Sequence, residues 1–203
     1  MTSKTILTLA LLSLLITPAL VRAQGADSST VARKLSSRIA SERRAAAEEL
    51  ARLAAIEHLR LVEGYRVQEK DERVKLALDW ALYRMGRGET LFELVGALDE
   101  KGRAEQSVAY LKQLEGPEPL YVFLGRVNGR TQARLLEVLA AVGDRGTLAK
   151  IEPYTQSLDP LIADAAKFAE REIQIRVEET PAVESKRERK VGKDGQPEDE
   201  PPF

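Results

Sequence analysis

The residues most often used for metal binding and acid–base chemistry are scarce in this chain. Among 203 residues there is one histidine, His58, and there is no cysteine. A zinc site would have to combine one imidazole with carboxylates, whereas zinc is mostly bound by several histidine or cysteine ligands. His58 lies in a helical pattern between Ile56 and Leu59, which we expect to face inward. We therefore interpret it as a packing or surface histidine.

Other groups have the residue types of a site but not its context. Asp71-Glu72 precedes a predicted helix and is explained as an N-terminal cap, and Asp99-Glu100 closes a helix as a solvated turn. The glycine-bounded stretch 143–146 lacks the strand and the Gly-Lys-Ser/Thr pattern of a phosphate loop, so we interpret its glycines as helix caps. Trp80 and Tyr83 have the spacing of interior packing. The sequence therefore predicts no enzyme activity, no metal and no cofactor.

The N-terminal segment has the organisation of an export signal. Lys4 precedes an apolar run over Ile6–Ile16, Pro18 ends that run, and Val21-Arg22-Ala23 offers a cleavage site after Ala23. About 20 apolar residues are needed to span a bilayer, which this run does not reach. We expect residues 1–23 to be removed and the protein to be periplasmic or secreted, with no stable membrane span. A retained anchor is the alternative, and residues 24–34 would form a short linker.

Residues 178–203 are charged, contain several prolines and are poor in apolar residues, so we expect a disordered tail. Its basic cluster, Lys186–Lys190, is either solvated or docked on an acidic surface, and the sequence favours the solvated state. Removal of residues 1–23 takes away Lys4 and Arg22 and no acid, which lowers the formal net charge from −1 to −3. Without a basic footprint, nucleic acid is not an expected partner.

The middle of the chain contains an internal repeat. The apolar anchors Leu50, Leu82, Leu111 and Leu139 lie near the ends of predicted helices and are 32, 29 and 28 residues apart. A weaker fifth copy begins at Asp159. A second helix follows each of the first four copies: Ala55–Gln68, Glu89–Asp99, Pro117–Val127 and Thr147–Ser157. The stretch Leu120–Leu124 has strand-like residues, but its helical neighbours favour a helix. This period indicates an all-α solenoid over residues 35–177.

Alanines on the first helices explain how such pairs would stack. Small side chains allow helix axes to approach to about 8 Å, and a two-helix unit gains stability from its neighbours. We therefore expect Ala45–Ala47 and Ala51, with Ala77 and Ala81 in the next copy, to form close contacts.

The stretches RRAAAEELARL (43–53), VKLALDWALYRMG (74–86) and RLLEVLAAVGD (134–144) are similar to the first helix of short bacterial HEAT-like repeats, V-R-x-A-A-x-x-A-L-G-x-I-G-D. The similarity is weak over Arg103–Gly116, where Ser107 and Ala109-Tyr110 replace alanines. The resemblance implies a right-handed α-solenoid of about four to five HEAT-like helix pairs. Another α-solenoid and a compact bundle are the structural alternatives.

In HEAT-like proteins the second helices line a concave binding face, so the resemblance implies a scaffold for an unidentified protein partner, and the N-terminal segment implies that this scaffold is exported. The residues that would form the face are Arg60, Glu63, Arg66, Glu93, Tyr121 and Arg126, with Tyr121 and Arg126 as its anchors. The alternative, that Tyr121 and Arg126 are ordinary surface residues, is favoured because binding hot spots are a minority even of interface residues. Alternative functions are a HEAT-like lyase or chaperone for a tetrapyrrole-type ligand, and homo-oligomerisation through an end repeat. A HEAT-like glycosylase would need a cationic groove that the charge balance does not offer.

Overall fold

The computed structural model describes residues 27–179, and over this range the chain is helical, with no β-strand. This confirms the predicted all-α class and includes Leu120–Leu124, which lie in a helix. The predicted export signal over residues 1–23 and its cleavage after Ala23 lie outside the described residues, and so does the tail predicted over residues 178–203, except that Glu178 and Glu179 end a helix.

Five helices correspond to the expected first helices: α2 (Ala40–Leu53), α4 (Glu72–Arg84), α6 (Ala104–Leu111), α8 (Gly129–Val142) and α10 (Pro160–Glu179). The second helices are α3 (Leu59–Gln68), α5 (Leu91–Gly96), α7 (Glu118–Leu124) and α9 (Arg145–Thr155). Four single 3₁₀ turns adjoin them: η1 (Lys34–Ser36), η2 (Ile56–His58), η3 (Gly88–Thr90) and η4 (Ala97–Asp99). α3 and α5 are therefore shorter than the pattern predicted, because 3₁₀ turns occupy part of their expected length.

An additional helix, α1 (Ser28–Arg33), lies where the sequence suggested a linker over residues 24–34. Asp27 caps it by accepting a hydrogen bond from the Ser29 backbone nitrogen at 3.3 Å. Val31, Ala32 and the following Leu35 are buried, and α1 packs on α2. The linker prediction is therefore wrong for residues 28–34, because their apolar side covers the first helix of the repeat region.

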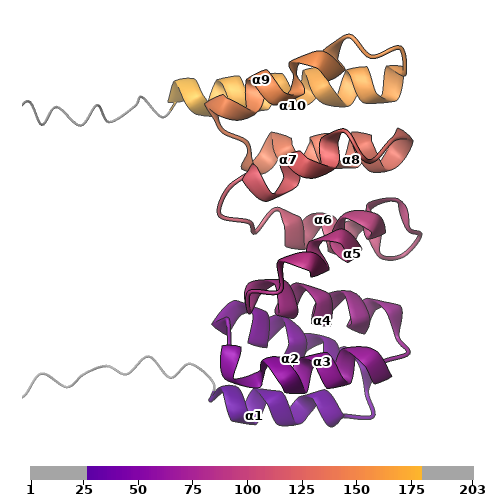
Figure 1. Cartoon of the computed structure of the whole chain (residues 1–203), viewed down its shortest axis with the longest axis vertical. Coiled ribbons are helices and arrows are strands. Elements are labelled where there is room, and N and C mark those ends of the chain that lie inside the picture. The colour runs from indigo at the N-terminus through magenta and orange to yellow at the C-terminus, as the bar shows by residue number, and fades with distance from the viewer. Residues whose placement is uncertain (1–26, 180–203) are drawn as a thin grey trace, which may run out of the picture.

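The helices follow one another along the long axis of the molecule (Figure 1). Each first helix contacts the next one, from α2 to α4, α6, α8 and α10, and α3, α5, α7 and α9 each pack on a first helix. All first helices run in the same direction across the view, so their C-terminal ends share one edge (left in Figure 1). The C-terminal end of α10 lies on that edge as well.

Alanine contributes much of the core in two places. α2 and α4 approach closely and carry buried alanines, and so do α8 and α10. The fully buried examples are Ala47, Ala51, Ala77, Ala81, Ala166 and Ala169. Ala45, which we expected in the contact, is exposed because it lies on the opposite side of α2 from Ala47. Small buried residues allow these backbones to approach.

An arginine near the start of four first helices recurs at intervals of 30, 30 and 31 residues: Arg43, Arg73, Arg103 and Arg134. Each links its helix to a neighbouring pair. The contacts are Arg43 Nε to Glu69 Oε2 at 2.7 Å, Arg73 Nε to the Gly102 carbonyl at 3.0 Å, Arg103 Nη1 to Glu72 Oε2 at 3.3 Å, and Arg134 Nη1 to Glu105 Oε1 at 2.8 Å. This periodic polar contact accompanies the periodic apolar contact.

Candidate functional site

The exposed side of the second helices forms one candidate site. In α5, Leu91 and Leu94 are buried, and in α7 the residues at the same offsets, Leu120 and Phe123, are buried too. Two outward positions therefore lie between each buried pair. The same pair of outward positions lies between apolar residues on each second helix. These positions hold Arg60 and Leu61 on α3, Phe92 and Glu93 on α5, Tyr121 and Val122 on α7, and Ala149 and Lys150 on α9. We call these eight residues the second-helix surface.

Three successive second helices contribute a large exposed apolar side chain to this surface. The exposed fractions are 43% for Leu61, 53% for Phe92 and 47% for Val122. Phe92 also meets the edge of Phe123, with 4.8 Å between ring centroids, which ties α5 to α7. Leu61, Phe92 and Val122 therefore form a row of exposed apolar side chains on helices that are packed against the core.

Three of the predicted partner-binding residues, Glu63, Arg66 and Glu93, belong to ion pairs. Arg66 Nε lies 2.6 Å from Asp79 Oδ1, and Arg66 Nη2 lies 4.0 Å from Glu93 Oε2. The Asp79 side chain is only 4% exposed. Burial raises its pKa above the ordinary value because the charged carboxylate loses solvation, while Arg66 opposes that shift. The primary role of Arg66 is therefore to neutralise a buried carboxylate.

The other predicted charges on α3 are closer to solvent. Glu63 Oε1 accepts a hydrogen bond from Arg87 Nε at 2.7 Å, across the turn that precedes α5. Arg60 is exposed on the same helix. The structure thus brings Glu63, Arg66 and Glu93 into a common region through Arg87 and Asp79, which the sequence pattern did not identify as their partners.

The two predicted anchors occupy different environments. The Tyr121 hydroxyl lies 2.7 Å from the hydroxyl of Thr147, a buried residue in the first turn of α9. Burial raises the pKa of Tyr121 above its ordinary value, and Lys150 Nζ lies 5.9 Å from its ring centroid. Tyr121 therefore joins α7 to α9 and exposes only part of its ring, whereas Arg126 is exposed in the turn after α7.

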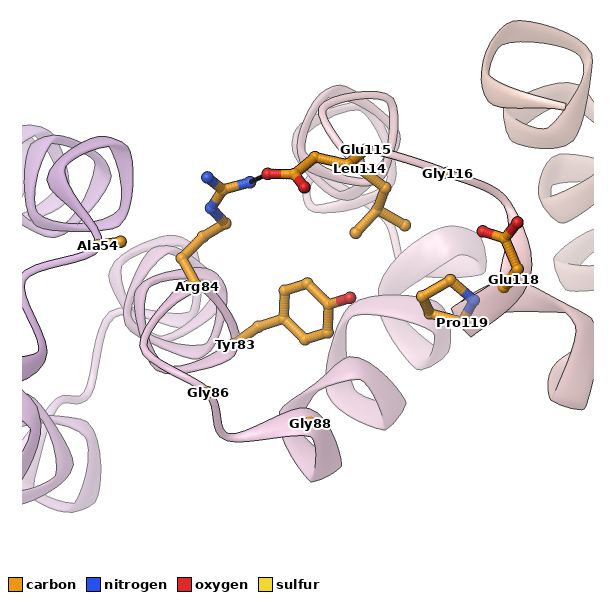
Figure 2. A pocket seen from close by; sticks show the side chains of 10 residues that line it. All are labelled: Ala54, Tyr83, Arg84, Gly86, Gly88, Leu114, Glu115, Gly116, Glu118 and Pro119. Carbon is orange, nitrogen blue, oxygen red and sulfur yellow. Dashed lines mark ion pairs between the residues drawn. The ribbon is translucent and has the colours of Figure 1, made fainter. Parts of the chain in front are cut away.

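A second candidate site is a cleft beside α4 and α6, with a volume of about 660 Å³ (Figure 2). Its lining residues are Ala54, Tyr83, Arg84, Gly86, Gly88, Leu114, Glu115, Gly116, Glu118 and Pro119. Figure 2 shows the Tyr83 hydroxyl directed into the space and the Arg84–Glu115 ion pair across one side, with 3.8 Å between Nη1 and Oε1. We call it the α4–α6 cleft.

A stack of three aromatic rings lies behind one wall of this cleft. Trp80 is 3% exposed and stacks between Tyr83 and Tyr110, with centroid distances of 5.7 and 5.6 Å. The guanidinium carbon of Arg84 lies 5.7 Å from the Trp80 ring centroid. The interpretation of Trp80 as interior packing is confirmed, but Tyr83 also lines a cavity. A sequence signal for this cavity is the glycine pair at 86 and 88, directly after α4.

The structure places His58, the one histidine of the sequence, in a contact between two elements. His58 Nε2 lies 3.2 Å from the Ser28 hydroxyl and 3.9 Å from Glu57 Oε1, so this histidine links α1 to η2. Ile56, expected to face inward, is 63% exposed because the 3₁₀ turn rotates it away from the core. Within residues 27–179 no three carboxylate or imidazole groups are placed to hold a metal ion. Over the same range no helix has the length and apolar character to cross a membrane.

Comparisons with known proteins identify no relative: no family model, curated protein or solved structure matches the chain significantly.

Proposed function

We propose that this chain is an exported, non-catalytic scaffold of HEAT-like helix pairs, and that its second-helix surface binds an extended segment of a protein partner. The HEAT-like solenoid is supported by the order of contacts between first helices and by the arginine that recurs about every 30 residues. In stacked repeats, each unit contacts its neighbours and presents equivalent positions along one surface. Export is supported by residues 1–23.

The observation that carries the binding proposal is the row formed by Leu61, Phe92 and Val122. Each is about half exposed, and each lies on a different second helix. Phe92 on α5 also meets Phe123 on α7, which links the second and third helices of the row. Contiguous exposed apolar side chains with a polar rim are typical of protein-binding surfaces. Here Arg60, Glu93 and Lys150 supply that rim, so the partner segment would combine apolar and charged side chains.

Site-specific crosslinking from position 122 of the full chain, expressed in its own cell, would identify the partner. Its affinity should then fall at least about tenfold for Leu61→Asp and for Val122→Asp, which is about 1.4 kcal/mol in binding free energy. The matched control is Leu158→Asp, because Leu158 is fully exposed between α9 and α10 and outside the surface. If both surface variants bind as tightly as the control, the second-helix surface is not the interface.

N-terminal sequencing of the protein recovered from cell fractions tests the export part of the proposal. Removal of residues 1–23 and recovery outside the cytoplasm are expected. An intact Met1 on cytoplasmic protein would contradict it.

A further inference from the structure

We propose that the α4–α6 cleft binds the basic segment Lys186–Lys190 of this same chain. The proposal uses residues outside the second-helix surface and does not depend on the function proposed above.

The lining of the cleft favours a cationic occupant. Three of its lining stretches lie at or just after helix C-termini, whereas Gly88 and Glu118 begin η3 and α7: Ala54 caps α2, Tyr83 and Arg84 end α4, and Leu114 lies shortly after α6. The C-terminal end of a helix carries partial negative charge and favours cations. Two carboxylates, those of Glu115 and Glu118, add to this charge.

The cations near the cleft do not neutralise it. The one cationic side chain in the lining, Arg84, is paired with Glu115 and lies beside the Trp80 ring. Arg87, in the loop that borders the cleft, is engaged with Glu63 on α3. The carboxylate of Glu118 therefore stays available to a cation that enters from outside.

The size and lining of the cleft suit long side chains. A volume of about 660 Å³ lies in the range of 300–1,000 Å³ typical of ligand sites. A Cβ atom built on Gly86 or Gly88 would meet no atom within 4 Å, so the wall on this side is backbone bordering open space. Tyr83 offers a ring and a hydroxyl, and Leu114 and Pro119 offer apolar contact. Long side chains with apolar stems and cationic ends match this lining.

The basic segment follows α10 closely in the sequence. The segment Lys186-Arg187-Glu188-Arg189-Lys190 has four cations among five residues and begins seven residues after Glu179, the last residue of α10. The C-terminal end of α10 lies on the same edge as the loops that follow α2, α4 and α6 (Figure 1). The chain that leads to the basic segment therefore leaves α10 at the edge of the molecule where the α4–α6 cleft lies.

The segment is also long enough to reach. From α10 the contacts lead to α8 and then to α6, and the cleft lies beyond α6. At 8–10 Å per step, the distance to cross is about 20–30 Å. Seven to eleven residues of extended chain span about 25–40 Å. Because the segment is tethered, its effective concentration is on the order of millimolar, and individually weak contacts suffice to hold it.

The absence of cysteine from the chain permits a direct test. Two cysteines are introduced into the full chain, Gly88→Cys in the cleft and Glu188→Cys in the basic segment. The matched pair joins Glu188→Cys with Arg145→Cys, at the start of α9, which packs on α10. A segment that is not docked would meet position 145 more often than position 88, because position 145 is nearer to α10. Docking reverses that order.

We expect the 88–188 disulfide to form about tenfold faster than the 145–188 disulfide at low ionic strength. In about 1 M salt, where the Debye length falls to roughly 3 Å, the advantage should be lost. Glu115→Gln with Glu118→Gln should reduce it at low salt as well. Leu61→Asp and Val122→Asp should leave it unchanged, which separates this proposal from the binding function.

Faster closure at position 145 at every salt concentration would overturn the proposal. So would an 88–188 rate that responds neither to salt nor to the two glutamine substitutions. Disulfide-linked dimers as the main product would assign the cleft to the segment of a second copy, and the intramolecular proposal would then be wrong.

Discussion

Two contacts between first helices differ in what fills them. α2 and α4 approach closely along their length and carry buried alanines such as Ala51 and Ala77. α4 and α6 approach at few points, and the stacked rings of Trp80 and Tyr110 lie between them. The second contact has the α4–α6 cleft at its edge, where Tyr83 ends the stack. We call these contacts the alanine junction and the aromatic junction.

The difference shows how a contact between two helices can have a cavity at its edge while its interior stays packed. Alanines bring backbones together and leave no room for a ligand between them. At the aromatic junction the large rings hold the backbones of α4 and α6 apart. The rings fill the space between the two helices as far as Tyr83, and the cleft begins there. The cost is that the aromatic junction depends on a few large side chains. Variants of the two junctions should therefore differ in their free energy of unfolding.

The largest effect is expected for Trp80→Ala in the aromatic junction. Removal of this buried ring leaves a cavity between Tyr83 and Tyr110 and should cost about 3–5 kcal/mol. Urea unfolding followed by far-ultraviolet circular dichroism measures it. Trp80→Phe keeps a ring and should cost less than half as much. A cost below about 1 kcal/mol for Trp80→Ala would show that the stack does not hold α4 to α6.

The alanine junction should respond to added volume instead. Ala77 is fully buried, so Ala77→Leu should cost about 1–3 kcal/mol by overpacking α4. Ala109 on α6 is exposed, and Ala109→Leu is the matched control with an expected change within about 0.5 kcal/mol. The same urea titration applies. Equal costs for the two variants would mean that alanine at position 77 is not required by close packing.

The ion pair at the alanine junction should make stability depend on pH. Hydrogen bonding from Arg43 on α2 lowers the pKa of Glu69, which precedes α4, from 4.5 to about 2. Because the folded-state pKa is depressed, the contribution is complete above about pH 4.5 and is lost as the pH falls towards 2. Glu69→Gln should therefore cost on the order of 2 kcal/mol at pH 7.

Unfolding midpoints of the wild type and Glu69→Gln between pH 7 and pH 2 test this dependence. Their difference should shrink steadily below pH 4.5. A constant difference across that range would exclude the Glu69 carboxylate as the titrating group.

The smallest effect is expected for the polar contact at the aromatic junction. The Tyr110 hydroxyl donates to Glu48 Oε1 at 2.7 Å and accepts from Gln106 Nε2 at 2.6 Å. Tyr110→Phe keeps the ring stack and should cost about 1 kcal/mol, visible as a lower thermal midpoint. Tyr83→Phe is the control, because its hydroxyl faces the cleft (Figure 2). If the two variants lose the same stability, the contact with Glu48 contributes nothing.

The sequence predicted the parts of the fold that follow from local periodicity. Helical spacing and alanine-rich patterns were sufficient for the all-helical class and for the buried positions of Leu50, Ala77 and Leu139. The cap by Asp71, which accepts hydrogen bonds from the Arg73 and Val74 backbone nitrogens, was predicted from its position before a helix. The helix at residues 28–33 was missed, because one turn and a half is too short to show a period.

The candidate sites were harder to predict from the sequence, because their residues come from different helices. Trp80 meets Tyr110 thirty residues away, and nothing in either local pattern indicates that contact. The signal that existed was the weak repeat copy over Arg103–Gly116, where Tyr110 replaces a small residue. A departure from the repeat pattern coincides here with the junction that has a cleft. The ion pair between Arg66 and buried Asp79 likewise depends on how α3 sits on α4.

The position of Trp80 also makes the protein its own optical reporter. It is the one tryptophan in the chain, so its ultraviolet emission comes from a single known place between α4 and α6. A red shift in that emission under conditions that leave the helical signal intact would reveal local opening of the middle of the molecule, ahead of its ends. Native-state fluctuations at this junction are therefore observable without attaching any dye.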